Sequence, residues 1–499
     1  MMRLTVLCAA ALAALATPVL ADVTPEELEA ISIPDKVETS IGTLEFFDGV
    51  PTDATIDALY DNLDRMRGMQ AFLDNVGAVS MYAVRRGLAD AGAEGANRIA
   101  LFADLMDSQT LVVTANTSTL YAYTFTDLAK DGPTVIEVPP AMLGFLNDAW
   151  QRFVGNMGVT GPDEGKGGKY LIVPPGYTGE IPDGYFVMRP TTNRNFMFLR
   201  GSIKDGLKPA VDNITAHLRV YPLKDADNPA ETAFVNMSNR AFNTVFPSDF
   251  SYFEYLDQVV QEEPIDAIDP EMRGVIAAIG IVKGQPFAPD ARMKGLLSEA
   301  AVLADATARA ITYDPRFAGV KIYPDDPASV WSTAFANKNT SFEADGTMNL
   351  AARVLYYFNA GGVTPAMATS APGKGSDYAL AVLDANHQAF DGSKTYKLHL
   401  PKDVPVKDFW AVTIYDTQTR SQLQTSQSFP TIGSQTQGMK QNADGSWDVY
   451  FAPEAPEGKE SNWLQTVPGK SWFTILRMYG PLEPWIDQTW RPGEIELVQ

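Results

Sequence analysis

Short apolar runs broken by glycine and proline set the main limit on what this chain can fold into. The longest such region extends from Leu111 to Arg200, with β-branched and aromatic runs at both ends and a middle rich in Gly, Pro and Asp. This pattern predicts strands, a long elaborated connection and further strands. Strand-like runs return after Asn339, in TYKLHLP, FWAVTIYD and SWDVYFAP. We therefore predict two β-sandwiches, the second with about 150 residues, the size of a jelly roll.

Helical periodicity marks other parts of the chain. Apolar residues recur at helical spacing from Ile56 through Leu59, Tyr60, Leu63 and Met66 to Leu73, and a second helix is expected across 78–88. Both helices should lie against an apolar surface. A further helical block is expected between about residues 225 and 340, where its Ala-rich segment suggests close helix packing. A short helix is also expected between Met142 and Trp150.

The first residues have the pattern of a secretory leader. Arg3 precedes an apolar run from Leu4 to Leu15, and Val19-Leu20-Ala21 resembles a signal-peptidase site. The run is too short for a permanent membrane span. We expect cleavage after Ala21 and a periplasmic or secreted protein. Cys8 is the single cysteine, so the mature chain would have no disulfide and no thiolate site.

The charge balance narrows the classes of partner. The formal net charge is −22, which disfavours nucleic acid and anionic lipid. No second apolar run is long enough to cross a bilayer, so no membrane span is expected. A small-molecule ligand and a homo-oligomer are the partners that the sequence leaves open.

The usual catalytic and cofactor motifs do not occur. The three histidines, His217, His387 and His399, have no metal-ligand spacing, and we expect no metal site and no cofactor. Strand alternation would place His217 on one face with Thr215 and Arg219. No nucleophile elbow or dinucleotide fingerprint is present, so catalytic residues stay unknown.

Two loops suggest ligands but fit turns better. The glycine-rich loop at residues 155–169 lacks the phosphate-binding pattern, because Lys166 is followed by Gly167. Residues 442–448 carry acidic side chains at alternating positions, as in a Ca²⁺ loop, but lack the long loop and final Glu of an EF-hand. We interpret both as turns.

Three groups of polar side chains are candidates for a binding site. Arginine and aromatic groups suit the recognition of a carboxylate or a sugar, through paired hydrogen bonds and ring stacking. Each group would serve equally as a hydrogen-bond network inside a sandwich. The groups are Asn116, Thr117, Thr119 and Tyr121; Tyr415, Asp416 and Arg420; and Asn462, Trp463, Arg477 and Tyr479.

Long motifs resemble two domain families that occur in tandem in exported bacterial proteins. FFDGVPT, TANTSTLYAYTFTDL and GPDEGKGGKYLIVPPGY resemble the domain of unknown function 1254. LPKDVPVKDFWAVTIYD, NADGSWDVYF, the Asn462-Trp463 pair and RMYGP resemble the domain of unknown function 1214, and KGQPFAPDARM resembles the helical piece between them. Relatives tend to have Asp shortly before G-x-x-G-P-D, where this chain has Asn156.

The resemblance implies a multidomain α+β protein with an immunoglobulin-like sandwich, a helical subdomain and a C-terminal jelly roll. It implies no reaction. The expected division is a leader at 1–21, an arm and helices at 22–97, the first sandwich at 98–224, the helical subdomain at 225–340 and the jelly roll at 341–499.

Our leading hypothesis is an exported protein that binds or processes a small polar or carbohydrate-like ligand in a cleft between domains. This hypothesis rests on the Arg, Tyr, Trp and Asn groups and on fold analogy. The alternative is a structural or assembly protein of the cell envelope, because aromatic sandwich faces also suit subunit contacts. A polar, partly open pocket would favour the first hypothesis.

Overall fold

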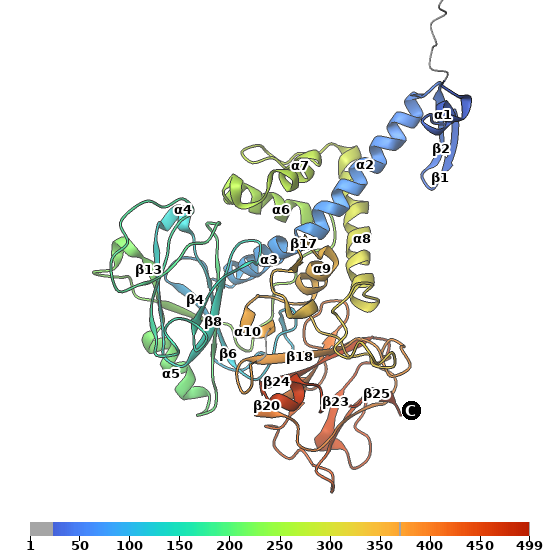
Figure 1. Ribbon diagram of the computed structural model, residues 1–499. Helices are drawn as coiled ribbons and strands as arrows, with labels where there is room; N and C mark the ends of the chain where they lie inside the picture. Colours follow the sequence, from blue (N-terminus) through green and yellow to red (C-terminus); the bar gives the residue numbers. More distant parts are fainter. Residues whose placement is uncertain (1–22, 369–370, 499) are drawn as a thin grey trace, which may run out of the picture. The chain divides into compact units, whose positions relative to one another are not determined.

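The computed structural model describes residues 23–368 and 371–498. The predicted leader and its cleavage site after Ala21 lie outside these residues. The described part contains eleven α-helices and seven sheets, which confirms the multidomain α+β organisation. Figure 1 shows the helices and strands coloured along the chain. The immunoglobulin-like and jelly-roll topologies stay predictions. The chain divides into two compact units, residues 1–63 and 64–499.

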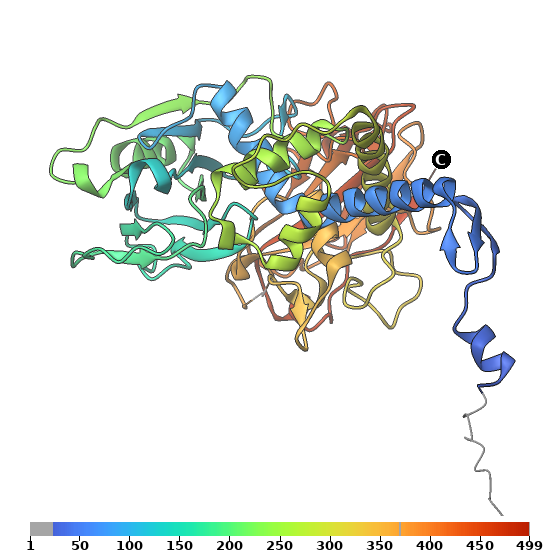
Figure 2. The same ribbon diagram turned by 90° about the horizontal axis from the view of Figure 1, so that it is seen from above.

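The first unit has little core of its own. Helix α1 (Pro25–Ala30) begins with a capping box between Thr24 and Glu27, and coil joins it to a small antiparallel sheet (Figure 2). Leu44 is the one large apolar side chain of its described residues that is buried. The sheet consists of β1 (Lys36–Thr39), β2 (Gly42–Phe47) and β3 (Val50–Pro51).

Helix α2 (Asp53–Asp74) corrects one expectation. Its apolar residues do have helical spacing, but Ile56, Leu59, Tyr60, Leu63 and Met66 are exposed, and only the end of the helix is buried. The predicted apolar surface is therefore present only for the C-terminal part of this stripe.

Six helices of the second unit share one core with the end of α2. Packing is close where α2 meets α8, because a Cβ on Gly68 would lie 2.8 Å from the Cβ of Ala300. Residues of the core come from all of these helices. They are α3 (Val76–Asp90), α6 (Ser251–Glu262), α7 (Pro270–Ala278), α8 (Ala291–Tyr313), α9 (Leu350–Asn359) and α10 (Pro365–Ala368).

Two sheets pack face to face in the first sandwich, around a core that includes Ala122, Leu199, Ile136 and Tyr170. The six-stranded sheet has the order β14 (Ala233–Asn236), β4 (Arg98–Phe102), β6 (Leu120–Phe125), β12 (Phe196–Gly201), β8 (Met142–Asn147) and β9 (Phe153–Gly158). The four-stranded sheet has the order β11 (Phe186–Met188), β10 (Gly168–Ile172), β7 (Thr134–Val138) and β13 (Arg219–Pro222).

The second sandwich is also built from two sheets, which pack around Leu398, Phe451, Trp410 and Trp472. One sheet has the order β18 (Ser376–Ala381), β24 (Trp472–Pro481), β20 (Val406–Asp416) and β21 (Thr431–Gly433). The other has the order β23 (Trp463–Gln465), β22 (Trp447–Ala452), β19 (Tyr396–Leu400) and β25 (Ile495–Leu497).

Several elements differ from the sequence-based expectation. The segment expected to form a helix after Met142 is strand β8, where the absence of a side chain at Gly144 lets the Phe198 carbonyl approach closely. His217 ends helix α5 (Leu207–His217) and does not lie in a strand. Strand β14 falls inside the block expected to be helical, because it pairs in parallel with β4. Within the described residues, no helix is both long and apolar enough to cross a bilayer.

The glycine-rich loop is a turn organised by Asp163. This buried carboxylate accepts hydrogen bonds from the backbone of Gly158 at 2.8 Å and of Gly167 at 3.1 Å, and from the Tyr170 hydroxyl at 2.5 Å. The turn interpretation therefore accounts for the loop without a ligand. Asn156 accepts a hydrogen bond from the Thr364 hydroxyl at 2.6 Å.

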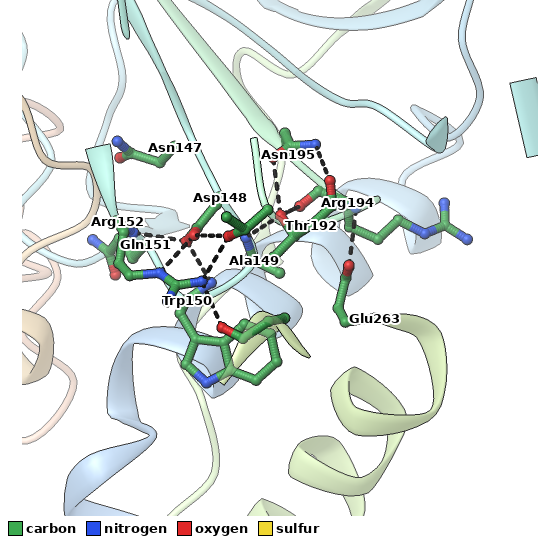
Figure 3. Close-up of polar contacts among 12 residues, drawn as sticks. Asn147, Asp148, Ala149, Trp150, Gln151, Arg152, Thr192, Arg194, Asn195 and Glu263 are labelled. Carbon is green, nitrogen blue, oxygen red and sulfur yellow. Dashed lines mark hydrogen bonds and ion pairs between the residues drawn. The ribbon is translucent and has the colours of Figure 1, made fainter. Parts of the chain in front are cut away.

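A second buried carboxylate joins the first sandwich to the helices (Figure 3). Asp148 accepts hydrogen bonds from the Arg152 backbone at 2.9 Å and from its guanidinium at 2.6 Å. Arg152 also donates to the Ala267 carbonyl at 2.9 Å. Next to it, Glu263 at the end of α6 accepts the backbone N–H groups of Asn193 at 2.5 Å and Arg194 at 2.9 Å. These contacts connect the loops before β9 and β12 to the helical core.

The burial of Glu263 predicts a pH dependence of stability. Burial raises the pKa of Glu263 to about 7 from an ordinary value of 4.5, although the two N–H donors oppose this shift. The folded state then binds the Glu263 proton more tightly than the unfolded state does. The stability that this proton gives to the folded state is therefore lost as pH rises from 4.5 to about 7. We expect the Tm of the wild type to fall relative to that of Glu263→Gln over this range. Differential scanning calorimetry would measure both.

The exposed Glu271 in α7 provides the matched control. Glu271→Gln should track the wild type at every pH. A constant Tm difference between the wild type and Glu263→Gln from pH 4.5 to 7 would contradict the assignment of a raised pKa to Glu263.

Candidate functional site

The outer faces of two sheets line one cavity. On β6 and β12, alternate residues point into the first sandwich, and the residues between them, such as Tyr121 and Phe198, point outwards. On β18 and β24 the same alternation turns Leu380 and Ile475 away from the second sandwich. The cavity between these faces has a volume of about 1050 Å³, counted with the open solvent at its mouth.

Helix α3, the segment after β5 (Thr110–Leu111), the segment around β15 (Phe242–Asn243) and the end of α9 complete the wall. The wall is mainly apolar and aromatic. Its described residues are Ser80, Met81, Val84, Leu88, Val112, Val113, Thr114, Ala115, Asn116, Tyr121, Tyr123, Phe196, Phe198, Arg200, Phe242, Thr244, Ala334, Phe335, Tyr356, Asn359, Ala360, Gly361, Met367, Tyr378, Leu380, Ile475 and Arg477.

Two arginines are the only charged residues among these described wall residues. Arg477 on β24 is 4% exposed and donates to the Tyr415 hydroxyl at 2.5 Å and to the Thr114 carbonyl at 2.7 Å. Its Nε has no hydrogen-bond partner among the described residues. Burial alone would lower the pKa of Arg477, but the phenols of Tyr415, Tyr479 and Tyr378 outweigh burial and raise it. Arg477 is therefore a buried cation whose Nε–H has no partner among the described residues.

Arg200 lies at the end of β12, where it pairs in register with Tyr121. Its guanidinium carbon lies 5.1 Å from the centre of the Phe198 ring and 5.7 Å from that of Tyr121. Burial opposes its charge, but the phenols of Tyr121, Tyr378 and Tyr479 stabilise that charge more, so the pKa of Arg200 is raised. Among the described residues, no carboxylate makes an ion pair with either Arg200 or Arg477.

Thr114 connects the segment after β5 to the second sandwich and to the end of α9. It adopts a positive φ of 44°, its N–H donates to the Arg420 carbonyl at 2.8 Å, and its hydroxyl donates to the Asn359 carbonyl at 2.8 Å. The hydroxyl of Tyr415, which accepts from Arg477, donates to the Ala115 carbonyl at 2.7 Å. The segment is therefore fixed to β20, β24 and α9 at once.

Arg420 supports the site from behind. Its guanidinium donates to the Phe358 carbonyl at 3.2 Å, near the end of α9, and lies 4.1 Å from the centre of the Phe358 ring. Burial, with the nearby charge of Arg309, lowers the pKa of Arg420 to about 10. Arg420 does not line the cavity. By donating to the Phe358 carbonyl, Arg420 caps the C-terminal end of α9, which is a structural role.

The nine predicted ligand-binding residues do not all lie in the cavity wall. Asn116, Tyr121 and Arg477 line the cavity. Tyr415, Tyr479 and Thr117 are buried beyond the wall, and Tyr479 stacks on Phe409 at 4.1 Å between ring centres. Residues 112–119 form a loop and not the strand that we expected, since the Asn116 side chain accepts a turn hydrogen bond from the Ser118 backbone at 2.9 Å.

Asn462 and Trp463 lie elsewhere, in the sheet of β22 and β23. Asn462 exchanges hydrogen bonds of 2.8 Å with the backbone of Lys440, and Trp463 donates to the Ala452 carbonyl at 2.8 Å. These contacts connect strands and loops of the second sandwich. The third predicted group is therefore not a single site.

Arg200 and Tyr378 were not among the binding-site residues predicted from the sequence. A signal for Arg200 was available, because Phe196, Phe198 and Arg200 alternate on one strand and face the same way as Tyr121 and Tyr123 on the next. No such local signal marks Tyr378, whose place in the wall comes from its pairing with Arg477 across two distant strands.

The described residues of the wall include no Asp, Glu, His, Lys or Cys. Their groups that can exchange a proton include hydroxyls and tyrosine phenols. What the wall offers is cationic hydrogen-bond donors set in an apolar surface.

Two family models match the chain. Protein of unknown function DUF1254 matches residues 96–222, and protein of unknown function DUF1214 matches residues 375–483. No curated protein matches.

Solved structures resemble the chain at low sequence identity. The VPA0106 protein from Vibrio parahaemolyticus is 18% identical, with a TM-score of 0.51 over 87% of this chain and 100% of that one. An uncharacterised protein from Burkholderia cenocepacia is 12% identical, with a TM-score of 0.39 over 89% and 97% of the two chains. The first likeness supports a shared fold and says nothing of function. The chain carries a DUF1254 domain followed by a DUF1214 domain, in the order that its motifs predicted.

Proposed function

We propose that this protein is an exported binding protein that holds a small molecule in the cavity between β6 and β12 on one side and β18 and β24 on the other. The single observation that carries this proposal is the cavity itself, whose apolar wall is drawn from both domains. Ligand pockets in proteins are mostly apolar and occur preferentially between domains.

Export is part of the proposal and is supported by the leader-like pattern of residues 1–21. The nature of the wall also bears on the ligand. Stacking on Tyr121 and Phe198 would suit a sugar ring, but polar wall residues such as Asn116 are few, which limits hydrogen bonding to many hydroxyls. A largely apolar ligand fits this wall better than a carbohydrate.

A cavity-blocking variant tests the proposal. Val84 lies half-buried on α3 in the cavity wall, so Val84→Trp should fill part of the space. Ligands that raise the Tm of the wild type through binding to the folded state should lose most of this effect in the variant. Thermal-shift screening against organic acids, lipids and sugars would measure it.

Val302→Trp is the matched control, since Val302 is a helical valine that is 61% exposed on α8 and lies outside the cavity wall. It should respond to ligands as the wild type does. Ligands that act equally on the wild type and on Val84→Trp would place binding elsewhere and contradict the proposal.

A role in assembly is a second candidate, favoured by the first unit. Its described residues leave Ile31 82%, Phe47 81% and Val50 64% exposed, a high proportion for large apolar side chains. Exposed apolar groups of this kind often mark contact surfaces. The two candidates do not exclude each other.

The assembly role makes its own prediction. The protein without its leader should be larger than a monomer, and the double variant Phe47→Ser, Val50→Ser should shift it towards the monomer. Light scattering after size-exclusion chromatography would measure the mass. Val302→Ser, Leu303→Ser removes two other exposed apolar groups, both on α8, and should leave the mass unchanged. A monomeric wild type would contradict the assembly role.

A further inference from the structure

We propose that the cavity binds an amphipathic carboxylate, with the anionic head at Arg200 and Arg477 and the apolar body along α3 and the segment around β15. This inference rests on the proposed function, which it makes more specific. It follows from the charge of the wall, from the donors that remain unused and from the apolar surface around them.

The charge argument begins with the contrast between these arginines and others. Among the described residues, Arg152 pairs with Asp148, Arg353 with Asp74 and Arg194 with Asp127. Arg200 and Arg477 have phenols and carbonyls around them and no carboxylate, in a chain whose net charge is −22. Two cations in an apolar wall without a counter-ion leave a positive potential, and an anion entering the cavity would neutralise it.

The unused donors indicate the shape of the head group. A guanidinium carries five N–H donors in a rigid fork, which matches the two oxygens of a carboxylate. The Arg200 guanidinium lies over the rings of Phe198 and Tyr121, and the hydroxyl of Tyr378, another wall residue, has no hydrogen-bond partner among the described residues. Arg477 uses its two terminal nitrogens on Tyr415 and Thr114 and leaves Nε unpartnered. Arg200 is therefore the principal ligand of the head, and Arg477 supplies one further donor and its charge.

The rest of the wall determines the body of the ligand. Met81, Val84 and Leu88 present one face of α3 to the cavity, and Phe242 and Val112 continue the apolar surface. A free inorganic anion or a short acid would leave this surface in contact with water. Each methylene group buried there should strengthen binding by about fourfold. An acid with an alkyl or aryl body fits both parts of the wall.

The test compares an acid with the alcohol of the same chain length. We expect decanoate to bind the wild type at least tenfold more tightly than 1-decanol, and acetate not to bind measurably. Isothermal titration calorimetry on the chain without its leader would measure the affinities. Octanoate, decanoate and dodecanoate should bind progressively more tightly until the cavity is full.

Arg200→Met keeps the length of the side chain and removes its charge. It should weaken decanoate at least tenfold and change 1-decanol by less than threefold. Arg316→Met is the matched control, because the Arg316 side chain is 86% exposed and lies outside the cavity wall. Arg477 also anchors Thr114, so its variant is the conservative Arg477→Lys, which keeps the charge and removes the fork. Its effect on decanoate should be smaller than that of Arg200→Met.

The outcomes separate this inference from the proposed function. If decanoate and 1-decanol bind equally well, or Arg200→Met binds decanoate as the wild type does, while Val84→Trp still blocks binding, the cavity binds a ligand and the carboxylate inference is wrong. If no compound of the series and none of the screen binds, both are wrong.

Discussion

The guanidinium of Arg477 is the contact on which the arrangement of the cavity depends. It joins the carbonyl of Thr114 to the hydroxyl of Tyr415, and the hydrogen bond to Thr114 connects residues 363 positions apart in the sequence. Thr114 in turn reaches Asn359 at the end of α9 and the backbone of Arg420. One cation therefore fixes the segment before β6, two strands of the second sandwich and a helix end relative to one another. The same residue faces the cavity, so the structural and the proposed binding roles meet in one side chain.

The sheets on both sides of the cavity are covered on both faces, and this explains what the sequence could predict. Strands β6, β12 and β24 read as nearly continuous apolar and aromatic runs because each face is buried, one in a sandwich and one at the cavity or the helices. Such runs identify strands well. They do not reveal which alternate residues face a ligand, since a shift of register by one residue exchanges the two faces. Tyr121 was nominated and Arg200, its partner in register, was not.

Helices and turns were predicted where the signal is local. Helices α6 and α8 follow their apolar periodicity, and Asp290 caps α8 by accepting the N–H of Met293 at 2.8 Å. The errors arose where tertiary pairing overrides local pattern. Segment 142–147 forms a strand because it lies between β12 and β9 in the sheet. The Asn462 side chain joins two backbone segments, because its amide bonds to the backbone of Lys440 and donates to the carbonyl of Asp448. The candidate site needs contacts between strands far apart in sequence, which no local pattern encodes.

The position of the two cavity arginines argues for a function beyond packing. Burying a cation without an ion-pair partner is costly, and apolar residues of similar volume often serve a core equally well or better. Arg420 illustrates how a structural arginine is accommodated here, with its guanidinium bonded to backbone carbonyls and covered by Phe358, away from the cavity. Arg477 and Arg420 each have one guanidinium nitrogen without a partner among the described residues, but Arg477 and Arg200 line the cavity and Arg420 does not. Packing alone accounts for Arg420 but leaves the exposure of two cations to one apolar cavity unexplained, whereas an anionic ligand with an apolar body accounts for both the charge and its surroundings.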